Sequence, residues 1–469
     1  MKNLLKRFPQ VSLIALIAGL VSLSNPLSVF AAGAASGHDT KAMALILIVL
    51  AVILISGKVF HLVERIKQPP VVGELLAGIV LGNIALLGFP LFREFNQDAI
   101  IQFLAQLGVI LLLFQIGLEA NIKELLKVGS KSAMVAIVGA VLPFALTTFL
   151  VAPLLLPGQP FITYLFIGAT MVATSVGIGV RVFKDIGQLK SKAATIFLGA
   201  TIIDDILSLI VLAVLTPMTS GIEITGGQVG FIFFKAIAFL VGSVVIGQLT
   251  APYIGKLFAK VNTGQGSKFT LSISLALIFG SLASLLSLEP IIGAFAAGLV
   301  LDPVHFKDFK DPELVEEIQQ EIADLTVKER KVADRLINIR SILRRHSHNS
   351  VEDLIAPLGL FLVPIFFVTT GISVQLESLA RLDTIGLALV LTIVAYATKF
   401  VGGMLIGGRT GMLVGLAMIP RGEVGLIFAT LGKSLGVFND QIFAVIVVTV
   451  LLTTIGAPAL LMNALQKKV

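Results

Sequence analysis

The sequence predicts an all-α protein that crosses a membrane many times. The chain has 469 residues, of which 56% are hydrophobic and 13% are charged. That charged share is about half of what soluble domains usually contain, and the mean hydropathy is +0.99. A transmembrane helix needs roughly 20 apolar residues, so the apolar residues could fill about thirteen spans. Long uninterrupted apolar runs also argue against a membrane β-barrel, whose strands alternate apolar and polar residues.

The composition excludes several functional classes. The high apolar share and the low charged share exclude a soluble enzyme, a disordered protein and a nucleic-acid-binding domain. The absence of cysteine excludes disulfides, cysteine–zinc sites and thiol nucleophiles. The formal net charge of +7 tells less than the positions of the positive residues along the chain.

Residues 1–31 have the features of a secretory signal peptide. Lys2, Lys6 and Arg7 precede an apolar stretch over residues 11–23, and small residues stand where cleavage would occur. The alternative is an additional membrane helix. We expect cleavage, which would place the mature N-terminus on the periplasmic or lumenal side.

Thirteen apolar segments follow and define a predicted transmembrane domain over residues 42–463. They lie at about 42–62, 71–88, 98–118, 132–155, 161–181, 192–215, 229–252, 269–287, 289–302, 353–375, 385–407, 411–431 and 441–463.

The loops between these segments predict the orientation. Most Lys and Arg residues of the short loops fall on the side predicted to be cytoplasmic, whereas the opposite loops hold only Arg93, Arg381 and Lys433. By the positive-inside rule, the C-terminus is therefore expected in the cytoplasm. The long loop 303–352 is rich in charge and carries apolar residues at helical spacing, which predicts a cytoplasmic amphipathic helix or helical hairpin.

The two halves of the predicted transmembrane domain share motifs. The matching stretches are 70–81 with 290–301, 114–117 with 367–371, and 168–178 with 415–426. Each pair is seven segments apart, and because seven is odd, the partners would cross the membrane in opposite directions. The sequence therefore predicts two inverted six-helix repeats joined by segment seven. Transporters commonly have this architecture, with the substrate site near the midplane of the membrane.

Segments five and twelve are predicted to be broken helices that meet in the interior. The first contains Thr174 and Ser175 beside two glycines, and the second contains Pro420, Arg421 and Glu423 around a glycine. Unwound backbone at membrane depth must be buried in protein or line water. Ordinary close packing of glycines is the alternative, but it does not explain the two charged residues.

Ionisable residues inside predicted membrane segments are costly and by default mark an ion pathway. Those at membrane depth are Asp204, Asp205, Lys399, Arg421 and Glu423, and Glu74 lies nearer the end of its segment.

Asp204 and Asp205 are expected to play different parts. Adjacent helix residues point about 100° apart, so one carboxylate can hold Lys399 while the other faces a cavity. A carboxylate with nearby Ser and Thr hydroxyls suits a hard cation such as Na⁺. For Asp204 and Lys399 alone, a purely structural ion pair remains the alternative.

Arg421 and Glu423 are two residues apart, so they do not face each other on a regular helix. We expect each to find a partner elsewhere, Glu74 being the candidate for Arg421. A structural role, bracing the two broken helices, is as consistent with the sequence as a functional one.

The motifs resemble those of the cation:proton antiporter-2 family, and most closely its NapA-type bacterial sodium/proton antiporters. The stretches that carry the resemblance are 68–78, 172–178, 203–214, 398–403 and 419–427. They occur in order across residues 42–463. The resemblance implies a NapA/NhaA-type fold of thirteen helices in a homodimer, with a dimerisation domain and a mobile core in which segments five and twelve cross.

The resemblance also implies roles for individual residues. Asp205 corresponds to the carboxylate that binds Na⁺, with Thr174 and Ser175 in the unwound stretch beside the ion. Asp204 corresponds to the carboxylate that pairs with Lys399, and this set is typical of electrogenic members that exchange two protons for one Na⁺. No cofactor is expected beyond the transported Na⁺ (or Li⁺) and H⁺. Transport would follow elevator-like alternating access and serve pH and sodium homeostasis.

Several alternatives stay open on the sequence. Related potassium efflux systems usually carry Gln-Asp where this chain has Asp204-Asp205. A sodium-coupled organic-anion symporter of related fold would not need Lys399, and an intramembrane aspartyl protease would need its two carboxylates on different helices. The signal peptide and the loop 303–352 resemble photosynthetic bacterial homologues, so the expected location is a bacterial inner membrane or a thylakoid membrane.

Overall fold

A computed structural model gives the fold. It describes residues 40–66, 68–87, 91–119, 129–188, 191–219, 226–261, 263–301, 350–379 and 382–466. The predicted signal peptide at 1–31 and almost all of the predicted loop 303–352 lie outside the described residues.

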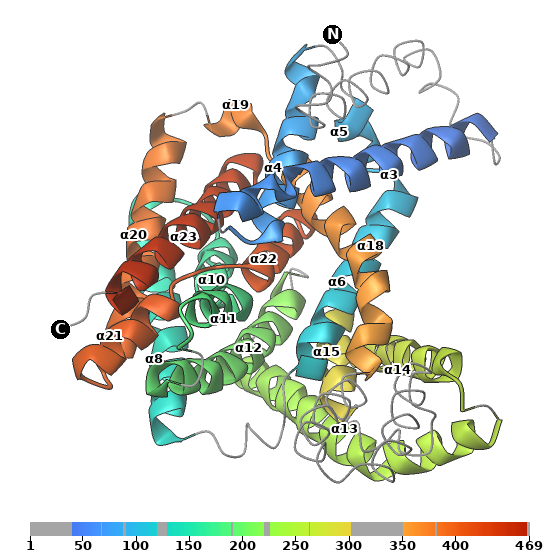
Figure 1. Cartoon of the computed structure of the whole chain (residues 1–469). Coiled ribbons are helices and arrows are strands. Elements are labelled where there is room, and N and C mark those ends of the chain that lie inside the picture. The colour runs from blue at the N-terminus through green and yellow to red at the C-terminus, as the bar shows by residue number, and fades with distance from the viewer. Residues whose placement is uncertain are drawn as a thin grey trace, which may run out of the picture. The chain divides into compact units, whose positions relative to one another are not determined.

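The described residues form helices and no strand (Figure 1). In the first half of the chain these are α3 (Thr40–Phe60), η3 (His61–Ile66), α4 (Pro70–Asn83), η4 (Ile84–Leu87), α5 (Leu91–Phe95), α6 (Ala99–Glu119), α8 (Ser130–Leu146), η5 (Thr147–Val151), α9 (Ala152–Leu155), α10 (Phe161–Thr170), α11 (Val176–Asp185) and α12 (Lys192–Met218). In the second half they are α13 (Gly226–Val261), α14 (Gln265–Leu285), α15 (Pro290–Val300), α18 (Ser350–Ile372), α19 (Leu376–Leu379), α20 (Leu382–Met404), α21 (Gly408–Ala417), α22 (Glu423–Ser434) and α23 (Asp440–Gln466).

Every apolar segment predicted from the sequence coincides with helix in the described ranges. Nine of these helical stretches are long and apolar enough to cross a membrane. Three further apolar helices are shorter, at Pro70–Leu86, Phe161–Thr170 and Pro290–Val300. The described part of the chain is therefore all-helical, and the protein is a multi-pass membrane protein.

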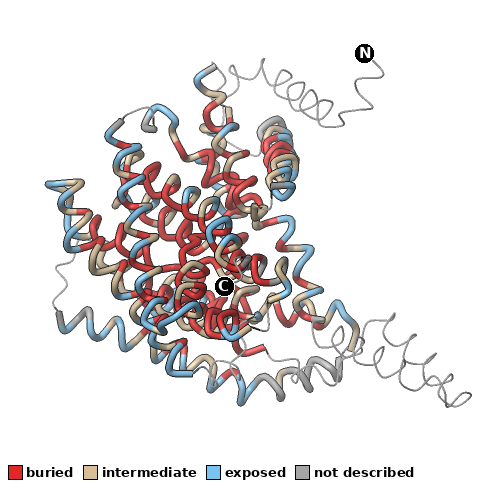
Figure 2. Tube along the Cα trace, turned by 60° about the vertical axis from the view of Figure 1, so that its left-hand side comes forward, coloured by how far each residue is buried: buried red, intermediate tan, exposed pale blue. Residues whose placement is uncertain are grey.

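Large apolar side chains face outward on helices that would meet lipid. In α13, Phe231, Phe234, Ile246 and Leu249 are each more than 60% exposed. Figure 2 shows buried and exposed positions following one another along single helices. A helix satisfies its backbone hydrogen bonds internally, so apolar side chains on its outer face leave nothing unsatisfied in hydrocarbon.

The chain divides into two compact units. One contains the described residues within 1–108, 127–221 and 362–469, and the other those within 109–126 and 222–361. The first unit holds both broken helices and all the ionisable residues predicted for the site.

Each unit contains close glycine contacts between helices, of which one in each unit involves segments of the predicted repeat. In the first unit, a Cβ at Gly78 of α4 would lie 2.0 Å from the Val368 carbonyl oxygen and 2.8 Å from the Gly371 Cα of α18. In the second unit, a Cβ at Gly298 of α15 would lie 2.4 Å from the Phe114 carbonyl oxygen of α6. The first contact joins predicted segments two and ten, and the second joins segments nine and three. Because segment two corresponds to segment nine and segment three to segment ten in the predicted repeat, the two contacts are equivalent.

Both predicted helix interruptions are present. α10 ends at Thr170 and α11 begins at Val176, while α21 ends at Ala417 and α22 begins at Glu423. Five residues separate the halves in each case, so the two breaks have the same length.

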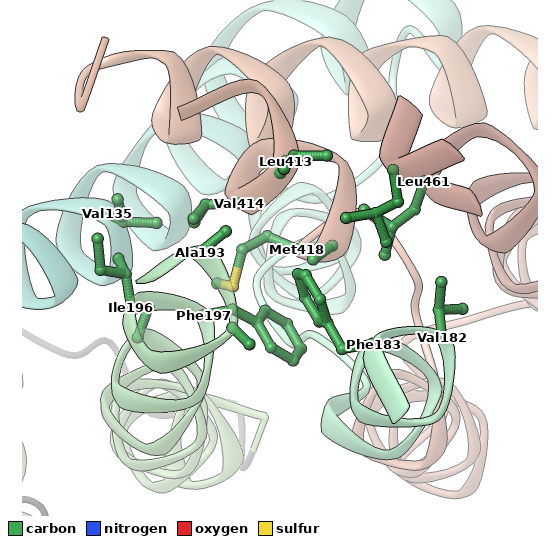
Figure 3. Close-up of a cluster of buried hydrophobic side chains, with 14 of the residues drawn as sticks. Val135, Val182, Phe183, Ala193, Ile196, Phe197, Leu413, Val414, Met418 and Leu461 are labelled. Carbon is green, nitrogen blue, oxygen red and sulfur yellow. The ribbon is translucent and has the colours of Figure 1, made fainter. Parts of the chain in front are cut away.

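A cluster of buried apolar side chains packs α8, α11, α12, α21 and α23 against one another (Figure 3). Phe183 and Phe197 stack obliquely, with ring centroids 5.9 Å apart. Met418, the first residue of the second break, belongs to this cluster. The break in α21–α22 is therefore anchored to α12, the helix that carries the aspartate pair.

Candidate functional site

The two helix breaks contact each other directly. The Ser175 backbone N–H donates to the Pro420 carbonyl at 2.9 Å, and the Thr174 hydroxyl donates to the Met418 carbonyl at 3.1 Å. Backbone groups released by one interruption are thus satisfied by the other, as buried polar groups require. Thr174 and Ser175, predicted to lie beside the ion, are both buried at this contact.

Asp204 of α12 and Lys399 of α20 form an ion pair. The Lys399 Nζ lies 3.0 Å from Asp204 Oδ1 and 3.2 Å from Oδ2, and both side chains are fully shielded from solvent. The predicted pairing of these two residues is therefore present in the structure. A buried pair of this kind is costly to form and very costly to break, because removing one partner strands a charge.

Asp205 faces a different environment from its neighbour. It keeps 8% of its surface exposed, whereas Asp204 keeps none. Lys399 interacts electrostatically with both carboxylates but makes its hydrogen bonds with Asp204. The divergence expected from helix geometry leaves Asp205, although buried, the more exposed carboxylate of the pair.

Arg421 lies in the second break and has no exposed surface. Its Nη1 donates to the Ala173 carbonyl at 2.9 Å, and its own carbonyl accepts a hydrogen bond from the Thr454 hydroxyl of α23. Among the described residues, its Nε and Nη2 have no hydrogen-bond partner. Arg421 thus links the second break to the first.

The predicted pairing of Arg421 with Glu74 is wrong. Glu74 instead contacts His61, with His61 Nε2 2.9 Å from Glu74 Oε1. The guanidinium acceptor is a backbone carbonyl exposed by the unwound stretch, and no side-chain pattern in the sequence signals such an acceptor. The sequence did not indicate His61 either, because it is the first residue of η3 and its position relative to α4 depends on how these two helices pack.

Glu423 is the first residue of α22. The Ser175 hydroxyl donates to its Oε2 at 3.3 Å, which joins the two breaks through side chains. A carboxylate at a helix N-terminus is also favoured by the unpaired N–H groups and dipole of the helix. Arg421 and Glu423 therefore both contact the first break from the second broken helix.

The site combines carboxylate, hydroxyl and carbonyl oxygens with the cationic side chains of Lys399 and Arg421. Among the described residues, no group of three or more His, Asp and Glu residues could hold a metal ion. Carboxylate, hydroxyl and carbonyl oxygens near the crossing suit a weakly held hard cation.

A family comparison agrees with this arrangement. The model of the family described as sodium/hydrogen exchanger, transmembrane, matches residues 46–321 and 340–467. These ranges include both breaks and every charged residue of the site. The chain belongs to the sodium/hydrogen exchanger family.

Relatives of this sodium/hydrogen exchanger family member cover nearly its whole length. The high-affinity Na⁺/H⁺ antiporter NhaS3 of the cyanobacterium Synechocystis sp. is 32% identical over 431 residues, with 84% of each chain covered. The Na⁺/H⁺-K⁺ antiporter GerN of Bacillus cereus is 29% identical over 422 residues, covering 88% of this chain and 94% of GerN. These relatives are named as transporters, so the family places this chain among transporters and not among enzymes.

A solved structure supports the fold of this exchanger. The sodium proton antiporter MjNhaP1 of Methanocaldococcus jannaschii superimposes with a TM-score of 0.62 at 16% sequence identity. The superposition covers 90% of this chain and 99% of the MjNhaP1 chain. At this identity, the likeness establishes a shared fold.

Proposed function

We propose that this protein exchanges Na⁺ (or Li⁺) for H⁺ across a membrane. The observation that carries the proposal is the fully buried Asp204–Lys399 pair beside Asp205, at the point where two broken helices meet. Buried ionisable groups of this kind are characteristic of ion and proton pathways. The family and the names of the relatives support the same function.

In this proposal, Asp205 binds the cation and protons compete for the same carboxylate. Thr174 and Ser175 would lie beside the cation, and what supports this is that their hydroxyls contact Met418 and Glu423 where the broken helices meet. Lys399 holds Asp204 and releases it as a proton is taken up or lost, so that proton binding alters the charge beside Asp205. Arg421 and Glu423 keep the two broken helices together while the site changes access.

The finer features of the proposal rest on the sequence motifs. The chain would be a NapA-type member of the cation:proton antiporter-2 family, with thirteen membrane helices in inverted repeats. It would form a homodimer and move its core by an elevator-like motion. The matched glycine contacts and the equal breaks support the repeat. The Asp-Asp-Lys set supports electrogenic exchange of two protons for one Na⁺.

The proposed placement in the membrane follows the charge of the loops. After cleavage of residues 1–31, the N-terminus would lie on the periplasmic or lumenal side and the C-terminus in the cytoplasm. The transmembrane domain would comprise residues 42–463, with the loop 303–352 forming a cytoplasmic amphipathic helical element. The membrane would be a bacterial inner membrane or a thylakoid membrane, and the name of the cyanobacterial relative is compatible with either.

K⁺/H⁺ exchange is the second candidate. It is favoured by one relative, GerN, whose name includes K⁺ as well as Na⁺. The pair of acidic residues argues for Na⁺, because potassium efflux systems usually carry Gln-Asp at this place. A sodium-coupled organic-anion symporter would not explain the buried Lys399.

Replacing Asp205 by Asn tests the proposal. In everted vesicles with a preformed proton gradient, Na⁺ added to the wild type should dissipate the gradient, and the variant should lose this response because it lacks the cation-binding charge. Asp353→Asn is the matched control, since Asp353 is exposed on α18 and belongs to the other unit. Full dissipation by Asp205→Asn would overturn the assignment. Repeating the addition with Li⁺ and K⁺ identifies the cation.

A further inference from the structure

The helix breaks, α12 and α20 bring five ionisable side chains together in the first unit. Three are acidic and two are basic: Asp204, Asp205, Glu423, Lys399 and Arg421. With all five ionised, the set carries a net charge of −1, which a single monovalent cation neutralises. At the breaks, the hydroxyls of Thr174 and of Thr454 in α23 donate to backbone carbonyls, and the acidic residue of α23, Asp440, is paired with Lys433 at 2.8 Å.

Hydrogen bonding alone does not account for Arg421. An arginine retained as a brace is expected to use its donors, because unsatisfied buried donors are costly. Here only Nη1 bonds to the first break, while Nε and Nη2 have no partner in the described part of the chain. Its positive charge, in contrast, acts on Asp204 and on Lys399. The charge reaches the ion pair although the side chain bonds only to backbone.

Glu423 has the opposite sign and, like Arg421, bonds to the first helix break. It lies two residues after Arg421 and accepts a hydrogen bond from Ser175, which neighbours Thr174 in the first break. The two charges thus sit on either side of Gly422, where a Cβ would lie 2.6 Å from the Ser175 Cβ. Together they bracket the crossing with one positive and one negative group.

We propose that Arg421 and Glu423 are positioning residues that set the Na⁺ affinity of the site by their opposing charges, in addition to joining the breaks. The inference rests on the proposed function, because it assumes that Na⁺ binds at Asp205. Arg421 weakens Na⁺ binding and makes release possible, whereas Glu423 strengthens it. The two effects offset each other, so the site is left with the single negative charge that one Na⁺ balances.

The proposal predicts shifts of opposite sign. Arg421→Gln should lower the Na⁺ dissociation constant and Glu423→Gln should raise it, each on the order of tenfold, the scale expected for removing one nearby unit charge in a protein interior of effective dielectric constant about 20. The double variant Arg421→Gln/Glu423→Gln should return to within about threefold of the wild type. Arg421→Lys keeps the charge and should also stay within about threefold.

Equilibrium binding of radiolabelled Na⁺ to the purified full chain at alkaline pH measures these constants directly, since few protons then compete. Monodisperse elution of each variant shows that it is folded. If Arg421→Gln does not elute as one species, Glu423→Gln against the charge-keeping Glu423→Asp provides the test, with weaker binding expected for Gln only.

Shifts of the same sign in the two single variants, or a double variant weaker than either, would mean that these residues only brace the helices and would overturn the inference. Absence of Na⁺ binding by the wild type would instead overturn the proposed function, and the inference with it. If the inference alone fails, the wild type still binds Na⁺ and Asp205→Asn still loses that binding.

Discussion

Asp204→Asn is expected to destabilise the protein by about 3–5 kcal/mol, the usual cost of stranding one member of a buried ion pair. The Lys399 ammonium hydrogen-bonds both oxygens of the Asp204 carboxylate, and neither side chain reaches solvent. The variant would leave the ammonium facing an amide that cannot neutralise it. Thermal denaturation of the purified protein in detergent measures the loss as a lower Tm.

A double-variant cycle separates the pair from its members. Lys399→Gln should also lower the Tm, because it strands Asp204, whereas Asp204→Asn/Lys399→Gln should recover much of the loss since no uncompensated charge remains. Equal and additive losses in the cycle would show that the two residues do not interact.

The same Lys399→Gln protein on a supported membrane should give a reduced Na⁺-evoked current if the lysine carries a transported proton. An unchanged current would assign Lys399 a structural role only.

Gly78→Ala is expected to lower stability by about 3 kcal/mol, near the upper end of the cost of overpacking a close contact. Its Cβ would lie 2.0 Å from the Val368 carbonyl oxygen, so α4 and α18 would have to separate. Neither the carbonyl nor the nearby Gly371 Cα is a flexible side chain that could yield. Alanine gains about 1 kcal/mol in helix propensity, which is too little to offset the clash.

Gly242→Ala in α13 is the matched control for this substitution. No atom lies within 4 Å of a Cβ added there, so the variant should be neutral or slightly stabilised by the better helix propensity. The corresponding contact of the second unit, at Gly298, predicts a loss of the same sign as Gly78. A neutral Gly78→Ala alongside a neutral control would contradict the close helix contact.

The helix breaks and the ion pair could be predicted because both violate the rules for apolar membrane segments. Glycine, proline and hydroxyl residues at membrane depth marked the interruptions that end at Thr170 and Ala417. Asp204 and Lys399 were the most deeply placed opposite charges in their segments, and a buried charge needs a partner. Their different exposure, with Asp205 the more open carboxylate, follows from neighbouring positions on one helix.

The partners of Arg421 and Glu74 could not be predicted for a physical reason. Pairing rules between side chains suggest that opposite charges meet, but the unwound backbone at Ala173 supplied a carbonyl that competes for the guanidinium. Glu74 instead contacts His61, whose ring reaches the Glu74 carboxylate because η3 packs against α4. Both outcomes depend on how helices pack in space, and periodicity along the chain carries no information about it.

The reversal potential of the purified protein in proteoliposomes tests electrogenic Na⁺/H⁺ exchange most directly. For two protons exchanged against one Na⁺, one net charge moves per cycle. A tenfold concentration ratio corresponds to ~59 mV for one transferred charge. A tenfold change in the Na⁺ gradient should therefore shift the reversal potential by about 59 mV. A change of one pH unit should shift it by about twice as much in the opposite direction, because two protons move per cycle. A current that responds to the pH gradient but not to Na⁺ or Li⁺ would contradict the account.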